Sequence, residues 1–345
     1  MTRSAARLLV VALWLAGCGS SDDGDGQRAF IDWARLRNPV LGFDDRALKD
    51  VAVAYHPGRK EFYVYSSTRF ELDDANNTAA VRSFYRTSDW RRFEPFGDPD
   101  VNGAGYGPGS PDVSRIGIVW QMVFQVESPA GGSARTLAGS VSTNLVDWSP
   151  PEPVAAEVMD PSLRNIDGAV AEHGGYLYLG WKRVQEFFVT RRPLLGAGWE
   201  PPIEASAAGA WAENFQFIEI DGAWRMVATG YDPLLFRCTG HPTWITYTCN
   251  HEPFIYRMDG SGDDLQDWTR WVDKTHLQIP FEDWNPAMHA NSAFLADWRE
   301  HDGYFYLFYA GSLEGDRFEL RGHGKIGVAR SRDLVEWRVA GDMDD

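Results

Sequence analysis

Hydrophobic and polar residues alternate along much of the chain after residue 27, and five of these alternating runs are rich in aromatic residues. The five runs span residues 61–65, 119–124, 176–181, 224–228 and 304–309. Alternation with a period of two places successive side chains on opposite faces of a β-strand. No segment shows a long helical period, and glycine turns such as those at Gly174 and Gly222 separate the runs. The pattern therefore predicts antiparallel strands and an all-β fold.

A shorter apolar strand is expected upstream of each aromatic run, and a polar residue opens every one of these shorter strands. The opening residues are Asp50, Asp112, Asp167, Glu213 and His289. Four of the five are acidic, so carboxylates recur at one place in a repeated order of strands. This recurrence is the first indication that the fold brings acidic side chains together.

A tryptophan follows each aromatic run. In four copies it ends a phrase of a hydroxyl or small residue, an acidic or amide residue and then Trp, and the copy at 190–199 is degenerate. The five copies end at Trp90, Trp148, Trp199, Trp268 and Trp337, at intervals of 58, 51, 69 and 69 residues. Five copies of this length predict five four-stranded sheets arranged radially, a five-bladed β-propeller, with each Trp packed between neighbouring sheets. A β-sandwich also has many strands but does not need five similar units. The stretch 259–283 is expected to be a surface insertion.

In a propeller the innermost strands surround a central channel, so the residues that open these strands should meet at one end of it. The residues expected to converge on one pocket are Asp50, Asp112, Asp167, Glu213 and His289. Clustered carboxylates repel one another, which raises the pKa of one and leaves another ionised. Such a pair supplies the general acid and general base that glycoside hydrolysis needs. The alternative, that an acid caps a strand or binds turn amides, is favoured for Asp112, which lies in a Ser-Pro-Asp turn.

The charge balance narrows the range of partners. The 345 residues include 33 Lys and Arg and 49 Asp and Glu, a formal net charge of −16. A surface of this sign repels phosphate, which excludes nucleic acid as a partner and disfavours anionic lipid. Hydrophobic residues make up 44% and charged residues 24%, proportions that exclude global disorder. Basic residues are sparse near the candidate acids, which disfavours an enzyme that uses phosphate.

Aromatic residues make up 14% of the chain, and most of them are expected in the core rather than on a sugar. The mid-strand tyrosines assigned to the core are Tyr63, Tyr178 and Tyr306. Better candidates for stacking on a sugar lie in loops expected to open on the channel. They are Tyr106, Trp211, Tyr231 and Trp284. Trp211 is included among the predicted substrate-binding residues.

The first residues are expected to direct export. Two arginines precede an apolar stretch, 8–15, that is too short to span a membrane stably as a helix. Leu15-Ala16-Gly17-Cys18 resembles the bacterial lipobox, in which the cysteine is lipidated after cleavage. We expect a signal peptide over 1–17, a polar tether over 18–27 anchored in a membrane through Cys18, and the propeller over 28–345. The chain would then lie in the cell envelope, on the outer membrane or cell surface; a plain secretory signal is the alternative.

Two cysteines remain for the folded part, Cys238 and Cys249, close together in a polar stretch. In an oxidising envelope they are expected to form a local disulfide. A zinc site that adds His241 and His251 is the alternative, although the spacing matches no common zinc module. No cofactor is expected to be required, and a structural calcium ion in the central channel is the one ion considered.

The order of the acids resembles that of the five-bladed glycoside hydrolases of families 43 and 62, with Asp in the first blade, Asp in the third and Glu in the fourth. The similarity extends over residues 38–340. Residues 49–55 and 62–67 resemble an arabinofuranosidase first blade, and 110–113 resemble the second-blade turn.

The resemblance implies a role for each acid. Asp50 is the implied general base, Glu213 the general acid, and Asp167 the residue that orients the acid and raises its pKa. His289 is implied to lie near a water or ion in the channel and near the sugar. Lys49 either reaches a sugar hydroxyl and helps keep Asp50 ionised, or faces away from the channel; it and Asp112 are taken as substrate-binding candidates.

The implied reaction is hydrolysis of a plant-type polysaccharide or oligosaccharide, with inversion at the anomeric carbon. α-L-Arabinofuranosides are the first implied substrates and β-xylosides the second. A water must fit between base and sugar, so we expect the carboxyl groups of Asp50 and Glu213 to lie roughly 6.5–9.5 Å apart. Two other classes remain open: a surface lipoprotein that binds glycans without cleaving them, and a glycoside phosphorylase or transferase.

Overall fold

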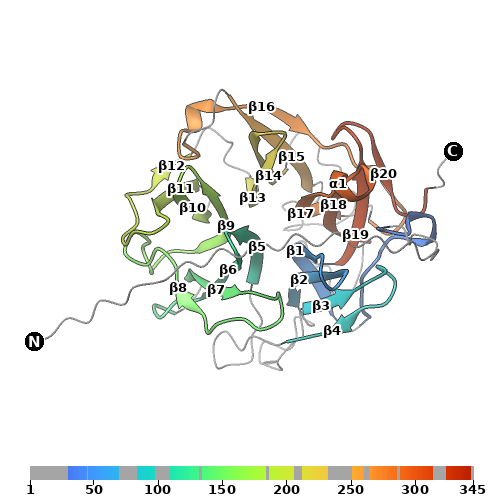
Figure 1. Ribbon diagram of the computed structural model, residues 1–345, viewed down its shortest axis with the longest axis horizontal. Helices are drawn as coiled ribbons and strands as arrows, with labels where there is room; N and C mark the ends of the chain where they lie inside the picture. The colour runs from blue at the N-terminus through green and yellow to red at the C-terminus, as the bar shows by residue number, and fades with distance from the viewer. Residues whose placement is uncertain are drawn as a thin grey trace, which may run out of the picture.

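The structure is a ring of five four-stranded antiparallel sheets around a common centre (Figure 1). It is a computed structural model that describes residues 30–44, 46–69, 84–97, 109–131, 134–183, 186–205, 212–231, 251–259, 264–285, 288–313 and 324–342. In each sheet the first strand lies nearest the centre and the last strand lies at the periphery. The five-bladed β-propeller predicted from the sequence is confirmed.

Each blade is a meander of four strands in chain order. Blade 1 contains β1 (Ala47–His56), β2 (Glu61–Arg69), β3 (Phe84–Thr87) and β4 (Glu94–Pro95). Blade 2 contains β5 (Gly109–Ile116), β6 (Val119–Glu127), β7 (Arg135–Ser142) and β8 (Glu152–Pro153). Blade 3 contains β9 (Asn165–His173), β10 (Tyr176–Arg183), β11 (Glu186–Pro193) and β12 (Ile203–Glu204).

Blade 4 contains β13 (Ala212–Ile220), β14 (Ala223–Tyr231), β15 (His251–Met258) and β16 (Trp271–His276). Blade 5 contains β17 (Met288–Asp297), β18 (Phe305–Ser312), β19 (Lys325–Ser331) and β20 (Trp337–Val339). Because β16 lies within 259–283, the expectation that this stretch is only a surface insertion is wrong.

The helical elements are short. They are η1 (Trp33–Arg35), η4 (Trp268–Arg270) and α1 (Arg299–Asp302). In the described part of the chain, none of the helices has the length and apolar character needed to cross a membrane.

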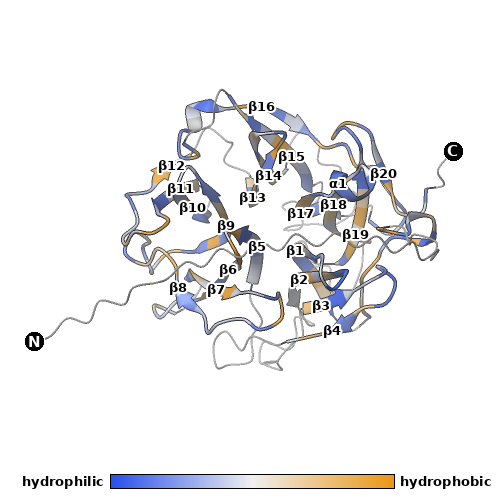
Figure 2. Cartoon of the chain, in the orientation of Figure 1, coloured by the Kyte–Doolittle hydropathy of each residue, from blue (hydrophilic) through white to orange (hydrophobic). Residues whose placement is uncertain are grey.

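Aromatic side chains fill the space between blades. Trp90 is 2% exposed, and its ring stacks on Phe308 of blade 5 with centroids 4.6 Å apart. Trp148 meets the edge of Tyr65 in blade 1 at 5.7 Å. Aromatic pairs of this kind contribute about 0.5–1.5 kcal/mol beyond their buried area. These two tryptophans pack between sheets as expected, and the mid-strand Tyr63, Tyr178 and Tyr306 are fully buried. Figure 2 shows hydrophobic and hydrophilic segments alternating along the strands of the ring.

The segment ahead of β1 closes the ring by pairing with the last blade. Leu41 bridges Ile326 of β19, and Leu48 exchanges backbone hydrogen bonds with Gly324. The Asn38 side chain donates to the carbonyl of Val328 and accepts from its N–H. Closure of the ring by these bonds leaves only short sheet edges exposed.

Each innermost strand is bulged near its start, where its register with the second strand shifts. One residue of each bulge has a positive φ: Asp50 (55°), Ser110 (44°), Asp167 (55°), Asn214 (52°) and Ser292 (52°). Asp and Asn tolerate this left-handed region better than most side chains do, and they occupy three of the five positions. A bulge redirects a side chain out of the strand's normal alternation. The five bulges therefore determine which residues face the channel.

This common bulge corrects the alignment of blades expected from the sequence. Asp50 and Asp167 occupy the bulge itself, whereas Glu213 precedes the bulge at Asn214. Asp112 and His289 lie farther from the bulges of their strands. Of the five residues expected to share one position, only two do, because apolar periodicity does not show where a bulge inserts an extra residue.

Asp112 links two neighbouring inner strands. Its Oδ2 accepts a hydrogen bond from the backbone N–H of Val170 in β9 at 2.9 Å. Gln216, at the same position relative to the bulge of blade 4, binds the N–H and carbonyl of Leu295 in β17 at 2.8 Å each. Burial raises the pKa of Asp112 to about 7, although the bonds from Val170 and Ser114 oppose the rise. Asp112 thus binds a backbone amide, as the turn alternative expects, and its predicted contact with substrate stays a prediction.

Replacing Asp112 by Asn should make the protein more stable at alkaline pH. The pKa is higher in the folded than in the unfolded chain, so the stability that this carboxyl contributes is complete below about pH 4 and is lost as the pH rises through about 7. Asn stays neutral and keeps an oxygen for Val170. We expect the free energy of unfolding of D112N to exceed that of the wild type by about 1–3 kcal/mol above pH 7, and to match it below pH 4.

Urea denaturation at a series of pH values measures this difference. The matched control is Gln216→Glu, which places a carboxyl at the equivalent position of blade 4 and should lower stability at high pH. A D112N variant whose stability falls with pH as steeply as that of the wild type would contradict the assignment.

Candidate active site

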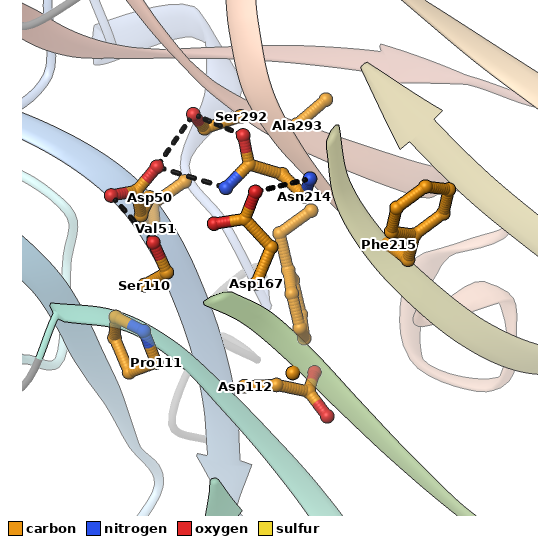
Figure 3. A pocket seen from close by; sticks show the side chains of 12 residues that line it. Asp50, Val51, Ser110, Pro111, Asp112, Asp167, Asn214, Phe215, Ser292 and Ala293 are labelled. Carbon is orange, nitrogen blue, oxygen red and sulfur yellow. Dashed lines mark hydrogen bonds between the residues drawn. The ribbon is translucent and has the colours of Figure 1, made fainter. Parts of the chain in front are cut away.

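A small pocket, open to solvent, lies at the centre of the ring. All five blades contribute to its lining. The lining consists of the residue that follows each bulge residue, of Asp112 and Phe294, and of the bulge residues themselves, which are Asp50, Ser110, Asp167, Asn214 and Ser292. In Figure 3 the side chains of Asp50, Asn214, Ser292 and Asp167 point toward one another, whereas Phe215 points away from them. The ring therefore brings together residues that are far apart in the sequence.

The Asp50 carboxylate is surrounded by hydrogen-bond donors and is only 7% exposed. Its Oδ2 accepts from the hydroxyls of Ser67 at 2.7 Å and Ser110 at 3.1 Å. Its Oδ1 accepts from Asn214 Nδ2 at 2.9 Å and from the Ser292 hydroxyl at 2.8 Å (Figure 3). A carboxylate has about four lone-pair positions, so these donors fill them and stabilise the ionised form.

The Ser292 hydroxyl has a choice of acceptors for its single proton. Its oxygen lies 2.8 Å from Asp50 Oδ1, 2.9 Å from Asn214 Oδ1 and 3.0 Å from Asn291 Oδ1. When the Ser292 hydroxyl donates its proton to either asparagine instead, one lone pair of the Asp50 carboxylate becomes available for another donor. That lone pair is where a water molecule can bind to a carboxylate that acts as a base.

Asp167 lies next to Asp50 in the pocket and is 5% exposed. Its Oδ2 accepts from the backbone N–H of Asn214 at 3.5 Å (Figure 3). Burial and the nearby charges of Glu213 and Asp50 raise the pKa of Asp167, and Lys182 and Lys49 offset part of this rise. Asp167 is therefore the carboxyl in this group that most readily holds a proton.

Glu213 lies beside the pocket and is surrounded by three cationic or protonatable side chains. Its Oε2 is 3.1 Å from Lys182 Nζ, and its Oε1 is 3.4 Å from Lys49 Nζ and 3.5 Å from His251 Nε2. Burial alone would raise the pKa of Glu213, but the charges of Lys49, Lys182 and His251 outweigh it and hold the pKa well below its usual value. These charges therefore favour the ionised form of Glu213.

Two expectations about this group need correction. The resemblance implied a raised pKa for Glu213, and the ligand-free site shows the opposite because of the two lysines. Basic residues were also expected to be sparse near the acids, whereas Lys49, Lys182 and His251 all lie within 3.5 Å of Glu213.

Lys49 joins the two carboxylates predicted to act as base and acid. Its Nζ lies 3.4 Å from Asp50 Oδ1 and 3.4 Å from Glu213 Oε1. Lys49 therefore faces the site, which decides between the two orientations left open by the sequence. Because both distances are 3.4 Å, Asp50 Oδ1 and Glu213 Oε1 can be separated by no more than twice 3.4 Å. Asp50 and Glu213 therefore share one site. The expected spacing of the whole carboxyl groups stays a prediction.

His289 is buried beside the channel rather than in it. Its Nδ1 lies 2.9 Å from Glu252 Oε1, its Nε2 lies 3.3 Å from the Pro280 carbonyl, and Phe281 stacks on its ring. Glu252 also pairs with His276 at 2.7 Å. His289, like Glu213, is not among the residues that line the pocket, and its implied position near the sugar stays a prediction.

Several residues singled out in the sequence lie outside the described residues. These are Cys18, Tyr106, Trp211, Cys238, His241 and Cys249, together with the side chain of Tyr231. The lipid anchor, the disulfide and the zinc alternative therefore stay predictions. Trp284 is described, and it packs on Tyr309 and donates to Glu282 rather than lining the pocket.

Sequence reasoning missed the residues that hold the acids in place. They are Ser67, Ser110, Lys182, Asn214, His251 and Ser292. One signal was available: Lys182 directly follows the aromatic run at 176–181, where a lysine interrupts a buried strand. The serines carry no comparable signal, because serine is common in strands and turns.

Within the described ranges, no three His, Cys, Asp or Glu side chains gather in a way that could hold a metal ion. The calcium ion considered for the channel therefore stays an untested expectation.

Three comparisons place the fold among known proteins. No family model matches the sequence, and no curated protein sequence matches it. Many solved structures match the fold. A thermostable family-43 glycoside hydrolase is 14% identical with a TM-score of 0.58, over 89% of this chain and 96% of that chain. The chain shares the fold of family 43 structures.

Two further matches have named activities. The α-L-arabinofuranosidase from Lactobacillus brevis is 13% identical with a TM-score of 0.56, over 89% of this chain and 96% of that chain. The endo-arabinase from Bacteroides thetaiotaomicron is 13% identical with a TM-score of 0.55, over 84% and 95% of the two chains. The resemblance expected from the sequence is thus supported at the level of the fold.

Replacing Ser292 by Ala should destabilise the protein, because it removes a hydrogen-bond donor to the buried Asp50 carboxylate. We expect a loss of about 1.5–3 kcal/mol in the free energy of unfolding at pH 7. The matched control is Ser140→Ala, since the buried Ser140 hydroxyl has no hydrogen-bond partner among the residues that the structure describes. This substitution should cost less than about 1 kcal/mol. Urea denaturation measures both, and equal losses would show that the Ser292 bond contributes nothing.

Proposed function

We propose that this protein is a glycoside hydrolase that cleaves α-L-arabinofuranosides, or closely related glycosides, in plant-type polysaccharides or oligosaccharides. The observation that supports this proposal most directly is the bridge that Lys49 makes between Asp50 and Glu213 at the centre of the ring. Two carboxyl groups in one site, one of them bound by hydroxyl donors that stabilise its ionised form, are the groups that glycoside hydrolysis requires. The fold shared with family 43 structures supports the same proposal.

In the proposed reaction a water molecule attacks the anomeric carbon while Asp50 takes its proton. The new bond joins that carbon to the water oxygen, and the bond from the carbon to the glycosidic oxygen breaks. Glu213 gives a proton to the departing oxygen, which leaves as an alcohol. Water and leaving group lie on opposite faces of the sugar, so the configuration at the anomeric carbon inverts.

Glu213 must gain a proton before it can act as the acid. We infer that a proton taken up by the pair Asp167 and Glu213 binds first to Asp167, because the lysines hold the pKa of Glu213 low while burial raises that of Asp167. A sugar hydroxyl that binds Lys49 would draw this cation away from Glu213. The pKa of Glu213 then rises, and the proton passes from Asp167 to Glu213.

The two lysines also bear on the phosphorylase alternative, because ammonium groups can bind phosphate. Both Nζ atoms already pair with the Glu213 carboxylate, at 3.4 and 3.1 Å. Their charges are therefore compensated, and we favour water over phosphate as the acceptor. We further propose that Cys18 carries a lipid anchor at the cell envelope and that Cys238 and Cys249 form a disulfide.

A screen of aryl glycosides tests the proposed function. We expect turnover of the 4-nitrophenyl α-L-arabinofuranoside, with the β-D-xyloside second, in buffer without phosphate. Replacing Asp50 by Asn should lower kcat by about 10²–10⁴-fold, because the amide cannot take a proton from water. Binding without turnover would indicate a glycan-binding protein, and turnover only with added phosphate would indicate a phosphorylase.

The leaving group tests the role of Glu213. Replacing Glu213 by Ala should lower kcat/KM on unactivated arabino-oligosaccharides by about 10²-fold or more beyond the loss on the 4-nitrophenyl substrate. The reason is that nitrophenolate departs without a proton, whereas a sugar alcohol does not. Steady-state kinetics on the two substrates, with Glu300→Ala at an exposed site as the control, measure the ratio. The same loss on both would remove Glu213 as the acid.

A further inference from the structure

Lys182 is a buried lysine to which neither the composition nor the resemblance assigned a role. It lies on β10, the second strand of blade 3, and is 5% exposed. Its Nζ lies 3.1 Å from Glu213 Oε2, in the neighbouring blade. Lysine is scarce in this chain, with five residues among 33 basic ones, and two of the five contact Glu213. A buried lysine is costly unless its charge is paired, so its placement requires a reason.

The position of Lys182 recurs around the ring. It pairs with Ile166, the residue before the bulge of β9, as Ser67 pairs with Lys49 and Thr229 pairs with Glu213. Ser67 donates to the bulge carboxylate Asp50 from this position. From this position of the second strand a side chain therefore reaches the site in two blades, a hydroxyl in blade 1 and a cation in blade 3.

The two oxygens of Glu213 have different surroundings. Oε2 is bound by Lys182, whereas Oε1 lies near Lys49, which also contacts Asp50. Oε1 is therefore the oxygen on the side of the proposed base. A lysine that holds Oε2 fixes the plane of the carboxyl and leaves Oε1 for the glycosidic oxygen.

We propose that Lys182 is a positioning residue for Glu213: it fixes Oε2 from the second strand of blade 3 and directs Oε1 toward the bond that is cleaved. This inference rests on the proposed function for its catalytic meaning. Lys49 can be drawn away by a sugar hydroxyl, whereas Lys182 stays on Oε2. Lys182 thereby sets how readily Glu213 gains and gives up its proton.

The charged and titratable groups that face Glu213 among the described residues come from four strands. They are Lys49 and Asp50 on β1, Asp167 on β9, Lys182 on β10 and His251 on β15. Removing Lys182 leaves the two aspartates in place and takes away the cation nearest to the carboxylate. The pKa of Glu213 must then rise.

The test compares Lys182→Gln, which is neutral but still donates a hydrogen bond, with Lys182→Arg, which keeps the charge. Carbon-13 NMR of protein with labelled glutamate side chains follows the titration of Glu213, assigned with Glu213→Gln. We expect K182Q to raise the pKa of Glu213 by about one unit or more, and K182R to leave it low. The control is Lys274→Gln, because Lys274 lies over the Phe254 ring on the outer part of blade 4.

Kinetics supply the second measurement. With the aryl arabinofuranoside as substrate, the basic limb of the plot of kcat/KM against pH should move to higher pH in K182Q. The shift should equal the rise in the pKa of Glu213 measured by NMR. KM should change by less than about threefold, while kcat on unactivated substrates falls by about tenfold or more, since the acid is misplaced. A merely structural lysine would lower activity at all pH values without moving the limb.

The outcomes separate this proposal from the proposed function. A wild type inactive on every glycoside refutes the function, while the NMR titration still decides whether Lys182 controls Glu213. An unchanged pKa of Glu213 in K182Q overturns the proposal whatever the activity. Should K182Q fail to fold, the double variant K182Q/E213Q decides: folding restored by removal of both charges supports the pairing, and a double variant that stays unfolded overturns it.

Discussion

The bulge in each innermost strand is the constraint on which the site depends. A regular strand would alternate its side chains between neighbouring blades, and no side chain would point along the channel. The extra residue, held with positive φ, places Asp50, Asp167 and Asn214 where they meet. Residues in this region cost on the order of 1–3 kcal/mol each, and they persist only when their surroundings fix them. In this ring the hydrogen bonds from Asn214 and Ser292 to Asp50 both restrain the bulges and prepare the carboxylate.

Charge compensation is the second constraint. Asp50, Asp167 and Glu213 lie close together and largely out of water, and an uncompensated cluster of this kind would be strongly destabilising. Lys49 and Lys182 offset part of the repulsion, and burial together with the remaining repulsion raises the pKa of Asp167. The same arrangement supplies a mechanism, because moving one cation changes which carboxyl is protonated. The lysine–carboxylate pairs that stabilise the folded site therefore also determine which carboxyl group can give up a proton in the reaction.

The fold could be read from the sequence to a large extent, whereas the site could be read only in part. Alternating runs and the spacing of Trp90 and its counterparts predicted the strands and the number of blades, because periodicity reflects burial. The position of the bulges could not be predicted, since an extra residue leaves the apolar pattern nearly unchanged. Asp50 and Asp167 therefore occupy the common bulge position, whereas Glu213, Asp112 and His289 do not, although Asp112 still lines the pocket. Lys182 was overlooked because its partner is more than thirty positions away in another blade and only the closed ring joins them.

The central claim is that a water held by Asp50 attacks the anomeric carbon from the face opposite the departing group. Proton NMR of the anomeric signals during the first minutes of hydrolysis tests it most directly, because the configuration of the first product is recorded before it mutarotates. We expect an α-L-arabinofuranoside to yield β-L-arabinofuranose first. Initial release of the α anomer would mean that a carboxylate forms a covalent intermediate, and it would contradict the roles of Asp50 as base and Glu213 as acid in a single displacement.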